Sequence, residues 1–248
     1  MKIQFIVPAK LEPELVEYLS CVVAPDVDIV GLSKGGVIES RRDLALILPE
    51  TLETIVAAEK GGYDAVCLAC LSDTGLEEGR ELVNIPVLAP LQVSMHVCSI
   101  LGHKFTILVP NEYMRRYMQE LITKYGFDGR GSVRTLKKSM PPDQAQIVFM
   151  EYKKSGKRPT SMIEDLVSEC MDAIKEDDAE VLGMGCGSLV WLAEMVRDEL
   201  GKRGYDIPVL NPWAVTIGIA RALVNLKLNH GYIVRPPVMP GMASEKAP

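Results

Sequence analysis

Short apolar runs alternate with longer amphipathic segments along the whole of this 248-residue chain. The apolar runs are rich in Val, Ile and Leu and predict strands at positions 2–7, 27–32, 65–69, 86–88, 104–109, 132–137, 180–184 and 208–210. Helical periodicity is present at positions 41–60, 113–125, 161–176, 189–202 and 214–228. Nearly continuous apolar strands that alternate with helices are typical of parallel sheets covered on both faces.

Three landmarks recur in the same order in the two halves of the chain. "FIVP" ends at Pro8 and "FTILVP" ends at Pro110, Cys70 and Cys186 each close the third predicted strand of their half, and "IPVLAP" and "IPVLNP" mark the fourth strands. Repeated landmarks in one order indicate an ancient duplication. We therefore predict an α/β fold with two pseudo-symmetric domains, each a four-stranded, mainly parallel sheet flanked by helices.

The domain boundaries follow from the helix after each "IPVL" strand, which we expect to cross to the other domain. The first domain then comprises residues 1–93 plus about 212–248, and the second comprises residues 94–211. Ligands of open α/β sheets bind beyond the carboxyl ends of the strands. If the two edges face each other, one interdomain cleft receives one cysteine from each half.

Two opposed thiols can exchange the proton on one carbon without a cofactor. One thiolate removes the proton, and the opposite thiol returns one to the other face, which inverts the stereocentre. The motifs "CLSDTGL" and "CGSLVWL" place each cysteine ahead of a predicted helix. A helix N-terminus stabilises a thiolate, and its free N–H groups bind a carboxylate or a developing enolate, so we expect both sites to favour the thiolate.

The same motifs resemble a known family. "CLSDTGL" resembles the "C-F-x-D-P-G-L" signature of hydantoin racemases, within the Asp/Glu/hydantoin racemase superfamily, and "GMGCGSL" resembles its second signature, "L-G-C-x-G-M". "GGVIESRRD" is similar to the family's "G-P-x-S-I-E" segment, and the two "IPVL" strands look like its "iPVxG" and "PVxDP" strands. The resemblance extends to about residue 229.

The resemblance implies roles for individual residues. Cys70 and Cys186 would be the catalytic acid/base pair, and no metal or organic cofactor would be needed. The substrate would be bound by Pro8, Leu71, Ser72, Pro110, Gly187 and Ser188. The chain departs from the family pattern at "VPAK", where only the proline of Asn-Pro-Asn-Thr remains, and at Leu71, Thr74 and Asn211. These departures leave the substrate open between hydantoin-like rings and amino acids.

Other chemistry at the cysteines is less consistent with the pattern. A redox C-x-x-C at Cys67 and Cys70 would point its side chains to opposite faces of an extended strand. A zinc site lacks a second pair of ligands, since "GCG" stands alone and the three histidines are scattered. Cys21, Cys98 and Cys170 lie in helical patterns and are expected to be core or surface residues without a role in the chemistry.

Several polar residues have a structural explanation beside a functional one. Asp73 is predicted to cap a helix that begins near Gly75, with an orienting role toward Cys70 as the alternative. Glu39 and Ser40 fit a solvated helix start as well as a place at the cleft. His96 and His103 are expected to be structural. The segment 152–160 is predicted to be a solvated loop with room for a lid, and the Pro-rich tail from residue 230 cannot form a regular helix.

Composition limits the partners. The net charge is −6 and 48% of the residues are hydrophobic, which argues against nucleic acid or an anionic membrane and for a small-molecule substrate. The N-terminus predicts a buried strand rather than a signal peptide, and no apolar run approaches the roughly 18 residues of a membrane span. Dispersed cysteines fit a reducing, cytoplasmic compartment. Apolar helices and the tail lead us to expect a homo-oligomer.

The leading functional hypothesis is a cofactor-independent racemase or epimerase that acts on a carbon next to a carbonyl. Within the same superfamily, maleate cis–trans isomerases use one cysteine as a nucleophile, and this remains an alternative. Arylmalonate decarboxylases keep only one of the two cysteines. The presence of both Cys70 and Cys186 in this chain therefore argues against that activity. From another class, a two-lobed small-molecule binding protein would need no matched thiols.

Overall fold

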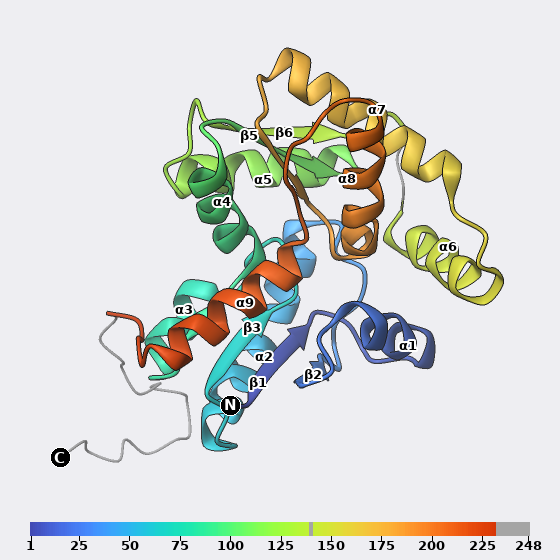
Figure 1. Cartoon of the computed structure of the whole chain (residues 1–248). Helices are drawn as coiled ribbons and strands as arrows, with labels where there is room; N and C mark the ends of the chain where they lie inside the picture. Colours follow the sequence, from blue (N-terminus) through green and yellow to red (C-terminus); the bar gives the residue numbers. More distant parts are fainter. Residues whose placement is uncertain (139–140, 232–248) are drawn as a thin grey trace.

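The structure is a computed structural model that describes residues 1–138 and 141–231. It contains two four-stranded sheets with the same strand order, β2-β1-β3-β4 and β6-β5-β7-β8, and each of their strand pairs is parallel. The strands are β1 (Ile3–Val7), β2 (Val27–Gly31), β3 (Ala65–Leu68), β4 (Val87–Leu88), β5 (Phe105–Val109), β6 (Gly131–Thr135), β7 (Val181–Met184) and β8 (Val209–Leu210). This confirms the predicted fold class and the internal repeat (Figure 1).

Helices connect the strands and cover the sheets. They are α1 (Pro13–Val22), α2 (Arg41–Lys60), α3 (Leu76–Leu82), α4 (Pro90–Leu101), α5 (Glu112–Lys124), α6 (Pro142–Ser155), α7 (Thr160–Glu176), the 3-10 helix η1 (Gly187–Leu192), α8 (Ala193–Lys202) and α9 (Pro212–Asn225). The sequence periodicity did not predict α1 or α6.

The central strands are buried on both faces, which explains their continuously apolar sequences. Every residue of β3, β5 and β7 is buried. In the first sheet Phe5 pairs with Cys67, and both are fully buried. Burial of such side chains contributes about 1.5–3 kcal/mol each, so the middle of each sheet is the most strongly stabilised part of the fold.

Two helices cross between the sheets (Figure 1). Helix α4 follows β4 of the first sheet but contacts β5 and β7 of the second, whereas α9 follows β8 of the second sheet and contacts β3 of the first. The two crossing helices also pack against each other. The crossing agrees with the reasoning behind the domain boundaries, but the boundaries themselves stay a prediction. The part of the first predicted domain at 232–248, and with it most of the Pro-rich tail, lies outside the described residues.

The segment 152–160 differs from the solvated loop predicted for it. Helix α6 continues to Ser155, and Gly156 ends it in a left-handed conformation with φ of 69°. The helix forms because its apolar face packs on aromatic rings. The Phe149 ring lies edge-on to the rings of Tyr18 and Trp191, with centroid distances of 5.0 Å and 5.2 Å. Only residues 156–159 remain as the connection to α7.

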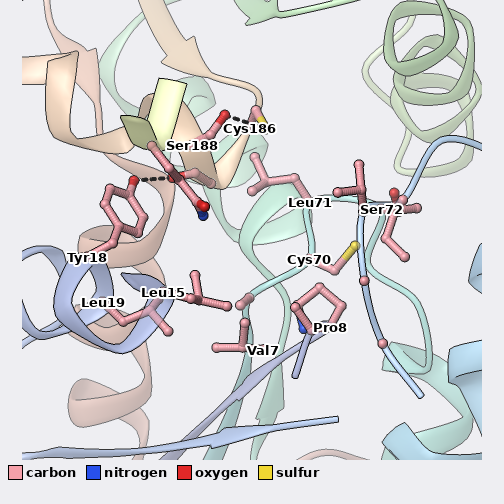
Figure 2. Close-up of a pocket in the computed structure, with 18 of the residues that line it drawn as sticks. Val7, Pro8, Leu15, Tyr18, Leu19, Cys70, Leu71, Ser72, Cys186 and Ser188 are labelled. Carbon is pink, nitrogen blue, oxygen red and sulfur yellow. Dashed lines mark hydrogen bonds between the residues drawn. The ribbon is translucent and has the colours of Figure 1, made fainter. Parts of the chain in front are cut away.

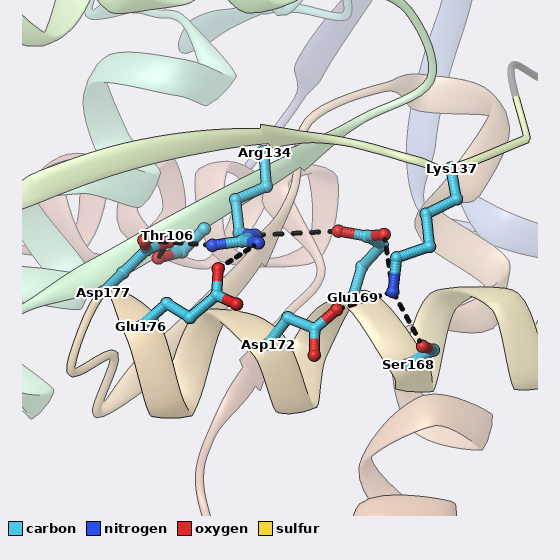
Figure 3. Close-up of polar contacts among 8 residues, drawn as sticks. All are labelled: Thr106, Arg134, Lys137, Ser168, Glu169, Asp172, Glu176 and Asp177. Carbon is cyan, nitrogen blue, oxygen red and sulfur yellow. Dashed lines mark hydrogen bonds and ion pairs between the residues drawn. The ribbon is translucent and has the colours of Figure 1, made fainter.

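A network of charged side chains joins α7 to β6 and the residues that follow it (Figure 3). Arg134 lies 2.8 Å from Glu176 and 3.1 Å from Asp177, and Lys137 lies 2.6 Å from Asp172. Both cations also lie within 4 Å of Glu169, which is only 3% exposed. A buried carboxylate requires such partners, because an unpaired buried charge is strongly destabilising. The network therefore holds α7 against the second sheet.

Candidate active site

A cavity of about 500 Å³ lies at the carboxyl ends of the strands and receives residues from both halves of the chain. Figure 2 shows Cys70 and Cys186 among the residues that surround it. The ends of β1 and β3, the turn after β7, the segment 35–38 and helix α1 supply most of the wall. The lining residues are Val7, Pro8, Ala9, Lys10, Glu12, Leu15, Tyr18, Leu19, Gly35, Gly36, Val37, Ile38, Ala69, Cys70, Leu71, Ser72, Tyr113, Met114, Gln146, Cys186, Gly187, Ser188 and Trp213.

All the predicted site residues except one line this cavity. The cysteines line it, as do Pro8, Leu71, Ser72, Gly187 and Ser188. Pro110 is buried and does not reach the cavity wall. The two halves differ here because Asn111, directly after Pro110, caps helix α5. The first turn of this helix places Tyr113 and Met114 in the cavity wall instead.

Cys70 lies in a tight turn after β3. The Asp73 N–H donates to the Cys70 carbonyl oxygen at 3.1 Å, and the Ala69 N–H donates to Ile6 of the neighbouring strand at 2.8 Å. Burial raises the pKa of the Cys70 thiol to about 11, although hydrogen bonds from Ser72 act in the opposite direction. Helix α3 begins only at Leu76, so the N–H groups near this sulfur belong to the turn and not to a helix N-terminus.

Cys186 does stand at a helix start, as the residue before η1. Its Sγ lies 3.1 Å from the Ser188 Oγ, and its carbonyl oxygen accepts the Leu189 N–H at 3.0 Å. Burial raises the pKa of Cys186, and hydrogen bonds from Ser188 and Gly187 only partly offset this. At both cysteines desolvation outweighs the neighbouring hydrogen bonds, so the pKa shift is opposite in direction to the one expected from the sequence.

Asp73 does not cap α3 as the sequence predicted. Its carboxylate accepts the N–H groups of Leu91 at 3.0 Å and Gln92 at 2.8 Å, in the first turn of α4, and the Tyr125 hydroxyl at 2.8 Å. Its backbone is left-handed, with φ of 52°. Burial raises the pKa of this carboxyl to about 7. Asp73 thus joins the Cys70 turn to a crossing helix and to the residue after α5, in the other half of the chain.

Two aromatic residues that the sequence analysis missed position the cysteine turns. The Trp213 indole N–H donates to the Ala69 carbonyl oxygen at 2.9 Å, and the Tyr18 hydroxyl donates to the Gly187 carbonyl oxygen at 2.6 Å. The Tyr18 bond is dashed in Figure 2. The chain has only two tryptophans, and one of them directly follows "IPVLNP", which was the available signal for Trp213. No local pattern marks Tyr18.

The segment that resembles "G-P-x-S-I-E" reaches the cavity through its first residues only. Gly35 lies so close to Pro8 that a Cβ would stand 2.4 Å from the proline carbonyl oxygen, so only glycine fits. Ser40 instead caps α2 by accepting the Asp43 N–H at 3.2 Å, and the Glu39 N–H donates to the Asp43 carboxylate. Neither Glu39 nor Ser40 lines the cavity.

The remaining candidates lie elsewhere. Cys67, Cys98 and Cys170 are buried in the core, and burial raises the pKa of Cys67 to about 12. His96 packs its ring edge-on against Phe127, away from the cavity. Within residues 1–138 and 141–231 no group of three or more His, Cys, Asp and Glu side chains could hold a metal ion. No helix in these two ranges has the length and apolar character needed to cross a membrane.

Comparisons with known proteins agree with this geometry. The Asp/Glu/hydantoin racemase family profile matches residues 24–220. The hydantoin racemase of Paenarthrobacter aurescens is 28% identical over 202 residues, which are 81% of this chain and 79% of the relative, and that of Pseudomonas sp. (strain NS671) is 27% identical over 190 residues, or 76% and 70%. The structure of allantoin racemase from Klebsiella pneumoniae matches with a TM-score of 0.77 and 24% identity, and covers 98% of this chain and 96% of its own. The chain belongs to the Asp/Glu/hydantoin racemase family and is an enzyme of the isomerase class.

Proposed function

We propose that the protein is a cofactor-independent racemase or epimerase in which Cys70 and Cys186 exchange the proton on a carbon next to a carbonyl. The observation that carries the proposal is that both cysteines line one cavity from equivalent strand ends of two sheets with the same topology. An acid and a base that approach one carbon from two such sites can deprotonate it on one face and reprotonate it on the other.

The raised pKa of the thiols fits this chemistry. A proton on carbon next to a carbonyl is only weakly acidic, so its removal needs a strong base. A thiolate whose pKa lies near 11 is a stronger base than a free cysteine thiolate, for which the pKa is about 8.5. The opposite thiol keeps its proton because burial raises the pKa of Cys186 as well. One sulfur must be ionised for each turnover, and the two exchange roles when the direction reverses.

The cavity wall favours a neutral ring over a free amino acid. Among the described residues of the wall Lys10 is the single basic side chain, and it pairs with Glu12 at 2.9 Å while 70% exposed. An α-carboxylate would therefore find no unpaired cation there. Leu15, Ile38 and Met114 give much of the wall an apolar character that suits the substituent of a hydantoin-like ring. The names of the two curated relatives point to the same substrate class.

The direct test incubates single enantiomers of 5-benzylhydantoin and of phenylalanine with the protein in D₂O. Chiral chromatography follows inversion and mass spectrometry follows deuterium at the stereocentre, against a control without enzyme because hydantoins also racemise spontaneously. We expect enzyme-dependent inversion and deuterium uptake with the hydantoin, and far less with the amino acid. Rates equal to the control for both compounds would reject a racemase of this substrate class.

A further inference from the structure

Tyr113 carries the one hydroxyl group of the described cavity wall that is not engaged within the protein. The side chain lines the cavity, and its oxygen is buried without a hydrogen-bond partner among the described residues. The other hydroxyl groups of the wall are engaged. Tyr18 donates to Gly187, Ser188 lies against Cys186, and Ser72 hydrogen-bonds Cys70. A buried donor is normally satisfied, so a bound ligand is the natural partner of the Tyr113 hydroxyl.

The position of this ring is well supported. Tyr113 lies in the first turn of α5, where the Asn111 side chain accepts the Met114 N–H at 2.9 Å. Its ring stacks on Tyr117 with centroids 6.3 Å apart and planes 25° apart. The Tyr117 hydroxyl in turn donates to the Ser72 carbonyl oxygen at 3.3 Å. The Tyr113 ring therefore packs on Tyr117, and Tyr117 is hydrogen-bonded to the turn that carries Cys70.

The Tyr113 hydroxyl keeps its proton at neutral pH, because its pKa is raised above the ordinary value. Burial raises the pKa of Tyr113, the nearby Arg41 opposes this, and a negative charge on Cys70 raises the pKa further. Tyr113 and Cys70 line the same cavity. When Cys70 is the base, Tyr113 offers a protonated hydroxyl group in the same cavity that has no partner among the described residues and is free to donate to the substrate.

We propose that Tyr113 is a catalytic residue that donates a hydrogen bond to the carbonyl oxygen next to the reacting carbon of the substrate. This rests on the proposed function. The Cys70 thiolate takes the proton from carbon, the electron pair of that bond moves toward the carbonyl, and the oxygen becomes an enolate oxygen. Tyr113 keeps its own proton and stabilises this charge, and the Cys186 thiol then protonates the carbon as the carbonyl re-forms.

The first test compares Tyr113→Phe with Tyr63→Phe. The control removes a surface hydroxyl that bonds Asp28 at 3.0 Å, away from the cavity. Loss of one donor to a developing oxyanion lowers kcat by about 10²-fold. For racemisation of 5-benzylhydantoin we expect a loss of that order in Tyr113→Phe, with a much smaller change in KM, and none in Tyr63→Phe. Circular dichroism melting curves check that both variants fold. A kcat within about threefold of the parent would overturn the proposal.

The second test measures binding without turnover, by calorimetry. The probes are 5,5-dimethylhydantoin, which has no proton on the carbon at position 5, and 4,4-dimethylimidazolidin-2-one, the same ring without the carbonyl beside the quaternary carbon. We expect the parent to prefer the hydantoin about tenfold and Tyr113→Phe to lose this preference, since one hydrogen bond contributes roughly that factor. No preference in the parent, or one that survives in Tyr113→Phe, overturns the proposal.

The two tests separate the proposals. A parent that shows the Tyr113-dependent preference but racemises neither the hydantoin nor the amino acid would reject the proposed function and support Tyr113 as the donor to the carbonyl. A parent that racemises normally and a Tyr113→Phe variant that does so equally well would leave the function standing and reject the role of Tyr113.

Discussion

The Trp213 indole N–H lies 2.9 Å from the carbonyl oxygen of Ala69, the residue before Cys70. The same indole lies so close to Gly187, the residue after Cys186, that a Cβ there would stand 2.3 Å from its ring. One side chain, carried by the crossing helix α9, therefore contacts the turns that hold both cysteines. Tyr18 gives the Gly187 turn a second contact from the first half of the chain. The cavity depends on these contacts between the halves.

A substitution at Gly187 tests this arrangement. Gly187→Ala should lower the free energy of unfolding by about 1–3 kcal/mol, because the added methyl group overpacks against Trp213. It should also reduce kcat, since the turn that holds Cys186 must move. Trp213→Phe replaces the indole by a smaller ring, so the double variant should recover part of the stability that Gly187→Ala loses. Urea unfolding of both single variants and the double variant measures the coupling between the two sites.

Gly201→Ala is the matched control, because a Cβ at that helical position meets no atom within 4 Å. It should be neutral or slightly stabilising. Strict additivity of the Gly187 and Trp213 substitutions would show that the two residues are not coupled.

Single cysteine substitutions should act with opposite handedness. Cys70→Ser removes the base for one enantiomer and leaves Cys186 to act on the other, and Cys186→Ser does the reverse. A serine hydroxyl is far less acidic than a thiol and cannot replace the base, so each variant should lose racemisation. Each should still exchange the proton of one enantiomer with D₂O, and the two variants should select opposite enantiomers.

Cys21→Ser is the control for this pair, because Cys21 is exposed on α1 and does not line the cavity. Near-normal racemisation in either cavity variant, or exchange of the same enantiomer in both, would contradict the opposed-thiol mechanism.

The activity should rise with pH through the neutral range. Burial raises the pKa of Cys70 to about 11, so in the free enzyme the thiolate is a small fraction that grows about tenfold per pH unit below that value. The logarithm of kcat/KM for 5-benzylhydantoin should therefore increase with a slope near one between pH 6.5 and 8.5. Initial rates by polarimetry measure the profile. A flat profile over this interval would show that the base is already ionised in the free enzyme.

Asp73 should make the protein less stable as the pH rises from about 4 to 7. Its pKa is raised from an ordinary 3.8 to about 7, so in this interval the native state holds a proton that the unfolded chain has lost. The unfolded state binds fewer protons, and the free energy of unfolding falls, by up to about 4 kcal/mol at roughly 1.36 kcal/mol per pKa unit. Above pH 7 this contribution is constant.

The variant Asp73→Asn cannot titrate, so its stability should fall less over the same interval. Urea unfolding at pH 4.5, 5.5, 6.5 and 7.5 compares it with the parent, and Asp128→Asn, an exposed carboxyl whose Oδ1 bonds Thr123, serves as control. Equal pH dependence in the parent and in Asp73→Asn would mean that the Asp73 carboxyl is ionised throughout this range.

The sequence by itself determined the strand pattern, the repeat and the two cysteines at matched strand ends. These features are local: a strand buried on both faces must be continuously apolar, and a motif at its carboxyl end needs no information from elsewhere. The tertiary structure decided what surrounds the sulfurs. Trp213 and Ala69 are 144 residues apart, and Tyr125 and Asp73 are 52 apart, so no local pattern could place them together. The tertiary structure also raises the pKa of both cysteines, whereas the sequence led us to expect a lowered pKa. Desolvation of the two thiols depends on the folded chain around them, and it outweighs the N–H groups that the sequence could anticipate.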